Sequence, residues 1–211
     1  YVGMAKETAH QLGTPISSLM GWMKLIKEDK SDFESISLSM NQDIQRLSEI
    51  SERFSKIGSI PKLKQLFLDN LFIEIISYMK NRLPNESKIK IIYDGTKDIY
   101  INGDWVLLSW AFENLLKNSI DAMVNNDGII KILAIKKDSY IVLDFIDTGK
   151  GITRSEWKKV FNPGFSSKVR GWGLGLSLAK RIFEEIHHGS IKLIFSKPGK
   201  TIFRIKIPSS I

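Results

Sequence analysis

The chain has 211 residues, of which 43% are hydrophobic and 26% are charged, so it is long enough for one large or two small globular domains. It contains no cysteine, which excludes disulfides and thiolate metal sites, and its three histidines are too few and too badly spaced for a zinc cage. The net charge of +8 comes from lysines scattered along the chain and not from a basic run, so nucleic acid is not an expected partner.

No membrane segment is expected within these residues. No apolar run approaches the ~18–20 residues that span a bilayer, and no signal peptide pattern is present. Because the sequence begins at Tyr1 and not at Met, we expect a cytoplasmic fragment of a longer protein. Any membrane attachment would then come from an upstream segment.

Two amphipathic helices are predicted at the N-terminus, over residues 6–27 and 33–57. In both, apolar residues step by three and four, the pattern of a narrow coiled-coil seam. The polar break at residues 28–32, with Ser31 or Asp32 as helix N-cap, predicts an antiparallel hairpin that ends at Gly58 and Pro61. The seam comprises Ala5, Ala9, Leu12, Ile16, Leu19, Met23 and Ile26 in the first helix, and Phe33, Ile36, Met40, Ile44, Leu47, Ile50, Phe54 and Ile57 in the second.

Such a hairpin has little core of its own, so its seam needs a cover. Two alternatives are open: a second copy, which would make a homodimeric four-helix bundle, or the remainder of the same chain. We favour the homodimer.

After Pro61 the sequence changes to short helices and strands. Helices are predicted over residues 66–78, 105–123 and 176–186, and strands over 89–93, 100–104, 129–135, 140–146, 190–195 and 201–207. This mixture indicates an α+β fold, a two-layer sandwich with helices on one face of a mixed or antiparallel sheet. The boundary is expected near residues 58–64, which gives domains of residues 1–60 and 61–211.

Two segments of the second domain carry polar residues suited to a nucleotide. Asn114 and Asn118 lie four apart and therefore share one helical face, where two amide oxygens suit Mg²⁺; the alternative is a surface or capping pair. Asp147 directly follows an apolar strand and can accept a hydrogen bond from an exocyclic amine such as that of adenine. Gly149 and Gly151 would let the backbone approach a flat base, although Asp-Thr-Gly is also common in simple turns.

Two further segments fit phosphate groups. Gly171, Gly173 and Gly175 precede a helix, so their N–H groups can face phosphate oxygens, but they match neither the Rossmann nor the Walker spacing. Residues 161–168 contain Pro and Gly and end at Lys168, which can neutralise a phosphate. This segment is interpreted equally well as a lid or as a surface loop.

The order and spacing of these segments resemble the ATP-binding domain of histidine kinases, whose GHKL (Bergerat) fold is shared with DNA gyrase, the Hsp90 chaperone and MutL. The resemblance identifies an N box (114–121), a G1 box (147–151), an F box (161–168), a G2 box (171–175) and a closing strand with Thr201. It implies ATP and Mg²⁺ as cofactors, with Mg²⁺ on Asn114 and Asn118 and adenine beside Asp147 and Thr201. The other cofactor-binding residues that it implies are Lys117, Gly149, Gly151, Phe161, Lys168, Gly171, Gly173, Leu174, Gly175 and Leu176.

Asn114 separates the kinases of this fold from its ATPases, which usually carry Glu at the matching position. Asn cannot be a general base, so another nucleophile must attack the γ-phosphate. Glu113 lies about 100° round the helix and cannot stand in. The sequence therefore favours phosphotransfer over hydrolysis.

The segment from His10 to Pro15 resembles the kinase H box, His-Glu-x-x-Thr/Asn-Pro. Because the seam uses Ala9 and Leu12, His10 is expected to point to solvent, where its neutral imidazole can act as a nucleophile near pH 7; a lone helical histidine is otherwise an ordinary surface residue. By resemblance, Thr14 orients a water in a phosphatase step. Gln11 replaces the common Glu and cannot take the imidazole proton, so either autophosphorylation is slow or another carboxylate such as Glu7 takes part.

The sequence is thus identified as resembling the catalytic core of a sensor histidine kinase of two-component systems. This resemblance implies ATP-dependent phosphorylation of His10, followed by transfer to an Asp of a response-regulator receiver domain. Two alternatives remain: an ATPase of the same fold, and a scaffold that binds nucleotide or receiver without chemistry, which Gln11 favours.

Overall fold

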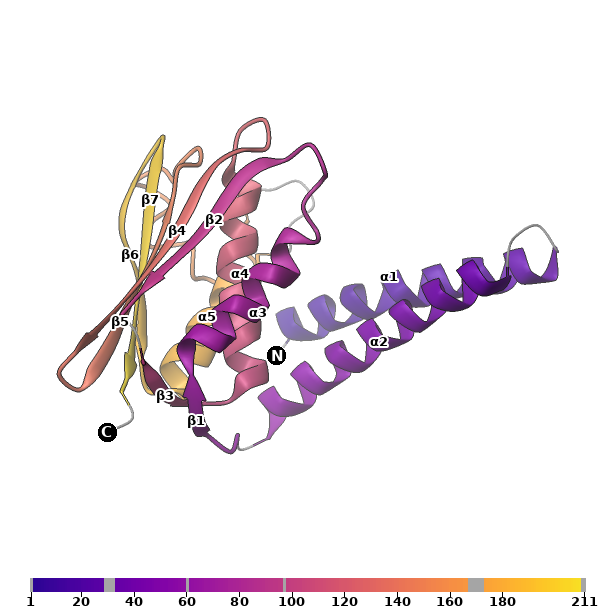
Figure 1. The fold of residues 1–211 in the computed structure, drawn as a ribbon, viewed down its shortest axis with the longest axis horizontal. Coiled ribbons are helices and arrows are strands. Elements are labelled where there is room, and N and C mark those ends of the chain that lie inside the picture. The colour runs from indigo at the N-terminus through magenta and orange to yellow at the C-terminus, as the bar shows by residue number, and fades with distance from the viewer. Residues whose placement is uncertain (1, 29–32, 60, 97, 167–172, 210–211) are drawn as a thin grey trace. The chain divides into compact units, whose positions relative to one another are not determined.

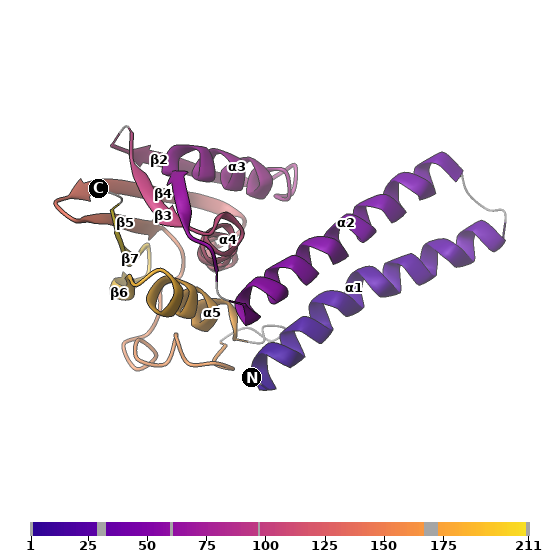
Figure 2. The same ribbon diagram turned by 90° about the horizontal axis from the view of Figure 1, so that it is seen from below.

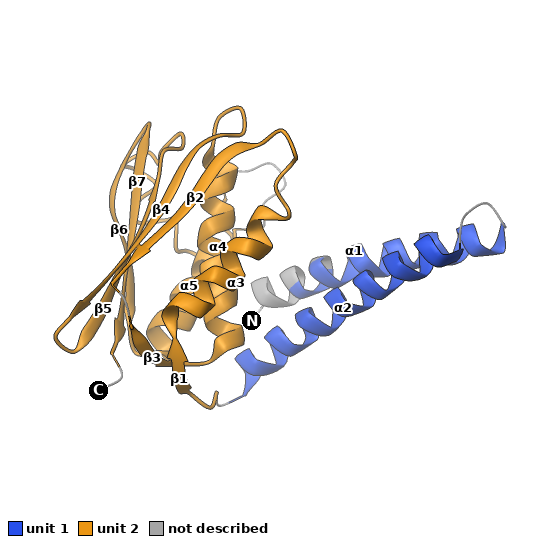
Figure 3. Ribbon diagram, in the orientation of Figure 1, with its two compact units in different colours: residues 1–60 blue, residues 61–211 orange. Residues whose placement is uncertain are grey.

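The computed structural model describes residues 2–28, 33–59, 61–96, 98–166 and 173–209, with the backbone alone for residues 2–7 and 10. The chain divides into two compact units, Tyr1–Ile60 and Pro61–Ile211 (Figure 3). None of the described helices is long and apolar enough to cross a bilayer.

The first unit is the predicted helical hairpin. Helices α1 (Val2–Lys27) and α2 (Phe33–Gly58) run antiparallel along each other (Figure 1). The indole Nε1 of Trp22 in α1 donates a hydrogen bond of 3.0 Å to Asp43 Oδ2 in α2. The predicted caps Ser31 and Asp32 lie outside the described residues.

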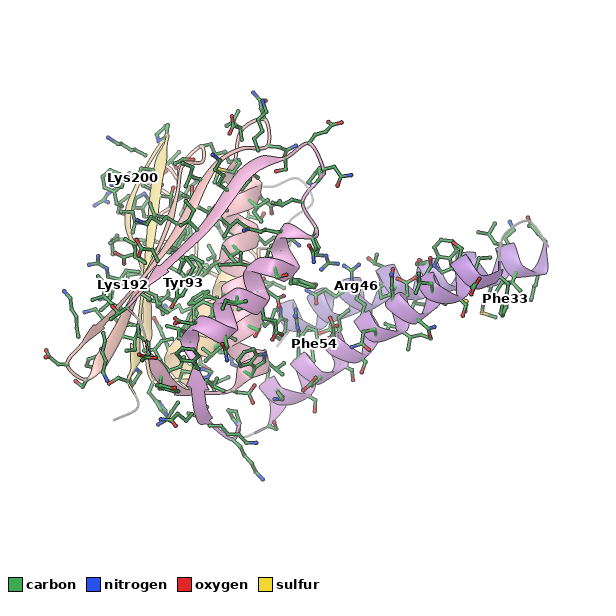
Figure 4. The ribbon with its side chains drawn as sticks, in the orientation of Figure 1. Phe33, Arg46, Phe54, Tyr93, Lys192 and Lys200 are labelled. Atoms are coloured by element: carbon green, nitrogen blue, oxygen red, sulfur yellow. The ribbon has the colours of Figure 1, made fainter. Side chains whose placement is uncertain are left out.

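A single hairpin covers only part of its own seam. Ile36, Ile50 and Ile57 are buried, whereas Ile44 is 53% exposed and Phe33, at the start of α2, is 70% exposed (Figure 4). In α1 the seam residues Ile16, Met23 and Ile26 are likewise exposed. Apolar surface therefore remains along both helices.

The second unit is an α+β sandwich, as the sequence predicts. Its five-stranded sheet has the order β2-β4-β5-β7-β6, with β2 and β4 parallel and every other pair antiparallel. Helices α3, α4 and α5 lie on one face of this mixed sheet (Figures 1 and 2). The bounds are α3 Leu68–Lys80, α4 Trp105–Ala122, α5 Gly175–Arg181, β2 Lys88–Gly95, β4 Asp127–Lys137, β5 Tyr140–Asp147, β6 Ser190–Lys197 and β7 Lys200–Pro208.

The prediction of a helix from residue 66 is wrong at its start. Strand β1 (Lys64–Phe67) pairs with β3 (Tyr100–Gly103), and α3 begins only at Leu68. Leu66 lies opposite Ile101, which is fully buried. A pairing partner 35 positions away in the sequence overrides the local helical pattern.

A cluster of phenylalanines joins the two layers. The Phe112 ring of α4 lies 4.8 Å from Phe72 of α3 and 5.7 Å from Phe145 of β5, and all three are fully buried. Tyr93 of β2 stacks on Phe72 at 4.8 Å, and its hydroxyl donates to Asp69 Oδ1 at 2.6 Å (Figure 4). Burial and this hydrogen bond raise the pKa of Tyr93. These contacts fix α4, which carries the N box, against the sheet.

The last helix predicted from the sequence changes from an α-helix to a π-helix within its length. The α-helix ends at Arg181 and continues as a π-helix, η1 (Ile182–Ile186), which the sequence pattern does not reveal. It presents His187, whose Nδ1 lies 2.8 Å from Ile182 O and whose Nε2 accepts a 3.1 Å hydrogen bond from the Asp104 N–H. The ring is therefore neutral, with its proton on Nδ1. It links the end of η1 to Asp104, the N-cap of α4.

His187 makes stability depend on pH. Burial lowers its pKa and outweighs the Ile182 hydrogen bond and the Asp104 carboxylate, which raise it; His188 adds a further lowering. Because the folded pKa is depressed, its contribution is complete above the unfolded pKa of about 6.5 and is lost as pH falls from there through the folded pKa.

We expect the free energy of unfolding of the whole chain to fall more steeply between pH 7 and 5 in the wild type than in His187→Gln. The difference in slope is at most about 1.4 kcal/mol per pH unit, the value for one proton. Denaturant unfolding at several pH values measures both slopes. His188→Asn removes only the smallest of these effects on the pKa of His187 and should keep most of the wild-type slope. Equal slopes for wild type and His187→Gln would contradict the assignment.

Candidate functional site

Asp147 and Thr201 lie side by side at one end of the sheet. They are Cα partners on β5 and β7, and each is only 2% exposed. Asp147 Oδ1 accepts a 2.9 Å hydrogen bond from the Gly149 N–H, and Oδ2 accepts one of 3.3 Å from the Ser119 hydroxyl of α4. Sequence reasoning missed Ser119, whose only signal is its place one residue after Asn118.

Burial leaves the Asp147 carboxylate short of solvation. Desolvation raises its pKa, against the hydrogen bonds from Gly149 and Ser119, which lower it. A raised folded pKa means that stability is lost as pH rises through it, so the ionised form is held at a cost to the fold. A hydrogen-bond donor on a ligand would offset that cost. Such a donor is what the exocyclic amine of adenine provides.

The turn formed by the G1 box (residues 147–151), called the G1 turn below, is held on both sides by backbone hydrogen bonds. The Lys150 N–H donates to Ala122 O at the end of α4, and the Gly199 N–H donates to Gly149 O, both at 2.9 Å. A Cβ on Gly149 would lie 2.7 Å from both Cβ and O of Ala122. Gly151 has a φ of +79°, and a Cβ there would lie 2.6 Å from the backbone of Lys197. Both positions therefore require glycine.

Gly149→Ala should lower the free energy of unfolding by about 1–3 kcal/mol, because its Cβ must push the end of α4 away from the turn. Thermal or urea unfolding of the whole chain measures the change. Gly13→Ala is the matched control: it lies in α1 with nothing within 4 Å of the added Cβ and should be neutral or stabilising. A neutral Gly149→Ala would show that the turn is not confined.

The amides of the N box share one face of α4, as their spacing predicts. Asn114 Nδ2 donates to Trp110 O at 2.9 Å, and a Cβ on Gly175 would lie 2.9 Å from Asn114 Oδ1. Asn114 and Asn118 are half-buried and Lys117 is exposed. Among the described residues no group of three His, Asp or Glu side chains could hold a metal ion. A cation here would use amide oxygens, waters and phosphates, a donor set that suits Mg²⁺.

The F and G2 boxes contact each other through Gly164 and Gly173, which lie nine positions apart in the sequence. The Gly164 N–H donates to Gly173 O at 3.1 Å, and a Cβ on Gly173, whose φ is +65°, would collide with Phe165 O. Leu174 is buried just before α5, and Leu176 is half-buried within it. Lys168 and Gly171 lie outside the described residues.

Phe161 packs on the sheet. Its ring meets Phe203 of β7 edge-on at 6.0 Å, and Lys180 Nζ of α5 lies 5.9 Å from the ring centroid. The F box is therefore anchored to the closing strand at its first residue.

The H box lies in α1. Gln11 is half-buried, Thr14 is exposed one turn further along, and Pro15 is buried within the helix. The side chain of His10 lies outside the described part of the chain, so its exposure to solvent stays a prediction.

The family model described as "Histidine kinase-, DNA gyrase B-, and HSP90-like ATPase" matches residues 103–211, just over half of the chain. The chain belongs to this family. The match begins directly before α4 and includes Asn114, Asp147, Gly173 and Thr201. The resemblance noted from the sequence boxes is thus confirmed, and an ATP-binding domain of this family accounts for their arrangement.

Relatives within the family are named as histidine kinases. Sporulation kinase B of Bacillus subtilis (strain 168) is 27% identical over an alignment of 216 positions, which covers 99% of this chain and 50% of that protein. The chain therefore spans about half of this relative. Sporulation kinase C of the same organism is 29% identical over 97% of this chain and 48% of its own length.

Solved structures agree on the fold. The catalytic domain of histidine kinase ThkA is 25% identical, with a TM-score of 0.64 over 70% of this chain and 96% of that domain. ThkA in complex with the response regulator protein TrrA matches 98% of this chain and 61% of ThkA, with a TM-score of 0.61 and 23% identity. The likeness thus includes both the hairpin and the sandwich.

Proposed function

We propose that the chain is the core of a sensor histidine kinase: it binds ATP with Mg²⁺, phosphorylates His10 and passes the phosphoryl group to an Asp of a receiver domain. The observation that carries the proposal is the buried Asp147 carboxylate beside Thr201, on a glycine turn that admits no Cβ. In a member of this ATP-binding family, that arrangement suits an adenine edge.

The residues of the candidate site and the H box then have defined roles in the phosphotransfer reaction. ATP supplies the phosphoryl group, and Mg²⁺ neutralises its charge. Asn114 and Asn118 offer oxygen atoms to the cation, and Asp147 accepts from the base. The neutral imidazole of His10 attacks the γ-phosphorus, the bond to the bridging oxygen breaks, ADP leaves, and the remaining ring N–H loses its proton to water. Gln11 can hold the ring N–H but cannot take its proton, which limits the rate.

Phosphotransfer is favoured over hydrolysis by the contacts of Asn114. Its amide nitrogen is engaged with Trp110 O, and an amide has no basic atom with which to activate water. A hydrolytic base would have to come from another residue. The phosphatase role proposed for Thr14 concerns a different substrate, the phosphorylated receiver, and needs only a hydroxyl that orients a water.

Two partners complete the proposal. A second copy would cover the apolar surface that one hairpin leaves along α1 and α2, where Ile16, Met23 and Ile44 are exposed. The receiver partner is supported by the ThkA complex, which contains a response regulator and matches nearly all of this chain.

His10→Ala should abolish labelling of the protein by γ-labelled ATP, because no other histidine lies in the H box. In the wild type the label should be labile in acid and stable in base, as a phosphoramidate is. His188→Asn is the matched control and should label normally. Gel autoradiography after acid and base treatment measures both variants.

The same assay separates the alternatives. Steady release of phosphate without labelled protein would indicate an ATPase. Nucleotide binding with neither label nor release would indicate a scaffold. Label that survives the His10→Ala substitution would contradict the assignment of the acceptor.

Asp147→Asn should weaken ATP binding at least about tenfold, because the amide presents donors where adenine also donates. It should leave the melting temperature unchanged or raise it, since the substitution removes a desolvated charge. Calorimetric titration and thermal unfolding measure the two effects. Asp138→Asn, in the β4–β5 turn, is the control; a variant that loses both binding and stability would show that Asp147 is mainly structural.

A further inference from the structure

Strand β6 breaks the alternation that a regular strand would follow. Leu193 pairs with Phe203, but the next pairs are Phe195 with Ile202 and Ser196 with Thr201, so Ile194 is an extra residue in a β-bulge. Ile194 and Phe195 are both 37% exposed. Since Leu193 lies opposite the buried Phe203, a strand without the bulge would turn Phe195 inward and Ser196 outward. With the bulge, the two side chains exchange faces: Phe195 is directed outward and Ser196 is directed to the helix-covered face of the sheet.

Ser196 lies in one row with the two residues of the candidate site. Asp147, Thr201 and Ser196 occupy adjacent positions on β5, β7 and β6. The Ser196 and Thr201 hydroxyl oxygens are 2.9 Å apart, and Ser196 Oγ accepts a 2.7 Å hydrogen bond from the Ile152 N–H. Ile152 directly follows the G1 box. One side chain therefore connects the closing strand to the end of the G1 turn.

The surroundings leave this connection little freedom. The Gly199 N–H binds Gly149 O, and the backbone of Lys197 lies where a Cβ on Gly151 would be. The β6–β7 turn, marked by Lys200 in Figure 4, is thus fitted to the turn of the G1 box at the residues that directly follow Ser196. Thr201 is 2% exposed, so its hydroxyl can turn only towards partners inside this row or towards a bound base.

We propose that Ser196 is a positioning residue for base recognition, and that the Ile194 bulge exists to direct it there. The inference rests on the proposed binding of ATP. Adenine presents a donor amine and an acceptor ring nitrogen, whereas guanine presents an acceptor and a donor at the corresponding atoms. A carboxylate beside a hydroxyl suits the adenine pattern. Ser196 holds the Thr201 hydroxyl and the G1 turn at the spacing that this pattern needs.

Three variants of the whole chain test the proposal, with ATP and GTP as the probes. Ser196→Ala should weaken ATP binding about tenfold and reduce the ATP-to-GTP affinity ratio, because it releases Thr201 and unpairs the Ile152 N–H. Ser196→Thr keeps a hydroxyl on a strand and should stay within about threefold of wild type for ATP. Ser190→Ala, a serine on the same strand without these contacts in the described structure, should change neither affinity. Competition against a fluorescent ADP analogue measures all four proteins.

The outcomes are distinct. If wild type does not bind ATP, the proposed function itself is wrong and this inference ends with it. If wild type binds ATP and Ser196→Ala binds it equally well, only this inference is overturned. It is also overturned if Ser196→Ala weakens the binding of ATP and of GTP by the same factor, because a merely structural role predicts that result. It is overturned as well if Ser196→Thr binds ATP as weakly as Ser196→Ala does.

Discussion

The Asp147 carboxylate is buried at the end of β5, and the surrounding structure is arranged to hold its charge. Two donors reach it from different directions, the Gly149 N–H from its own turn and the Ser119 hydroxyl from α4. They do not fully replace water, so burial still raises its pKa. In the proposed function, a donor on the bound base would complete its hydrogen bonding. The position of α4 relative to β5 is therefore the constraint on which the site depends.

Two sets of contacts maintain that position. The phenylalanine cluster around Phe112 fastens the middle of α4 to the sheet, and His187 together with the Asp104 cap fixes its N-terminus. The C-terminal end meets the G1 turn at Ala122, with no space for a Cβ on Gly149. The helix that carries Asn114 and Asn118 is thus held at both ends and at its middle.

The two units have different physical tasks. The sandwich has its own core, in which Phe72, Phe112, Phe145 and Phe183 are fully buried, and it needs no partner to bury them. The hairpin has a narrow apolar seam and few buried residues among those described, and in the proposed function a second copy would cover that seam. In the proposed function, this separation puts the nucleophile on one unit and the nucleotide on the other.

The sequence by itself determined the local elements and the identity of the boxes. Two short apolar segments around a turn marked β4 and β5, seam spacing marked α1 and α2, and the glycine spacing marked the turns. Tertiary structure decided the rest. Strand β1 exists because Leu66 lies opposite Ile101, the π-helix because it presents His187 to Asp104, and the inward turn of Ser196 because Ile194 bulges from β6. Each of these depends on a partner in another helix or strand, and a local pattern carries no information about such a partner.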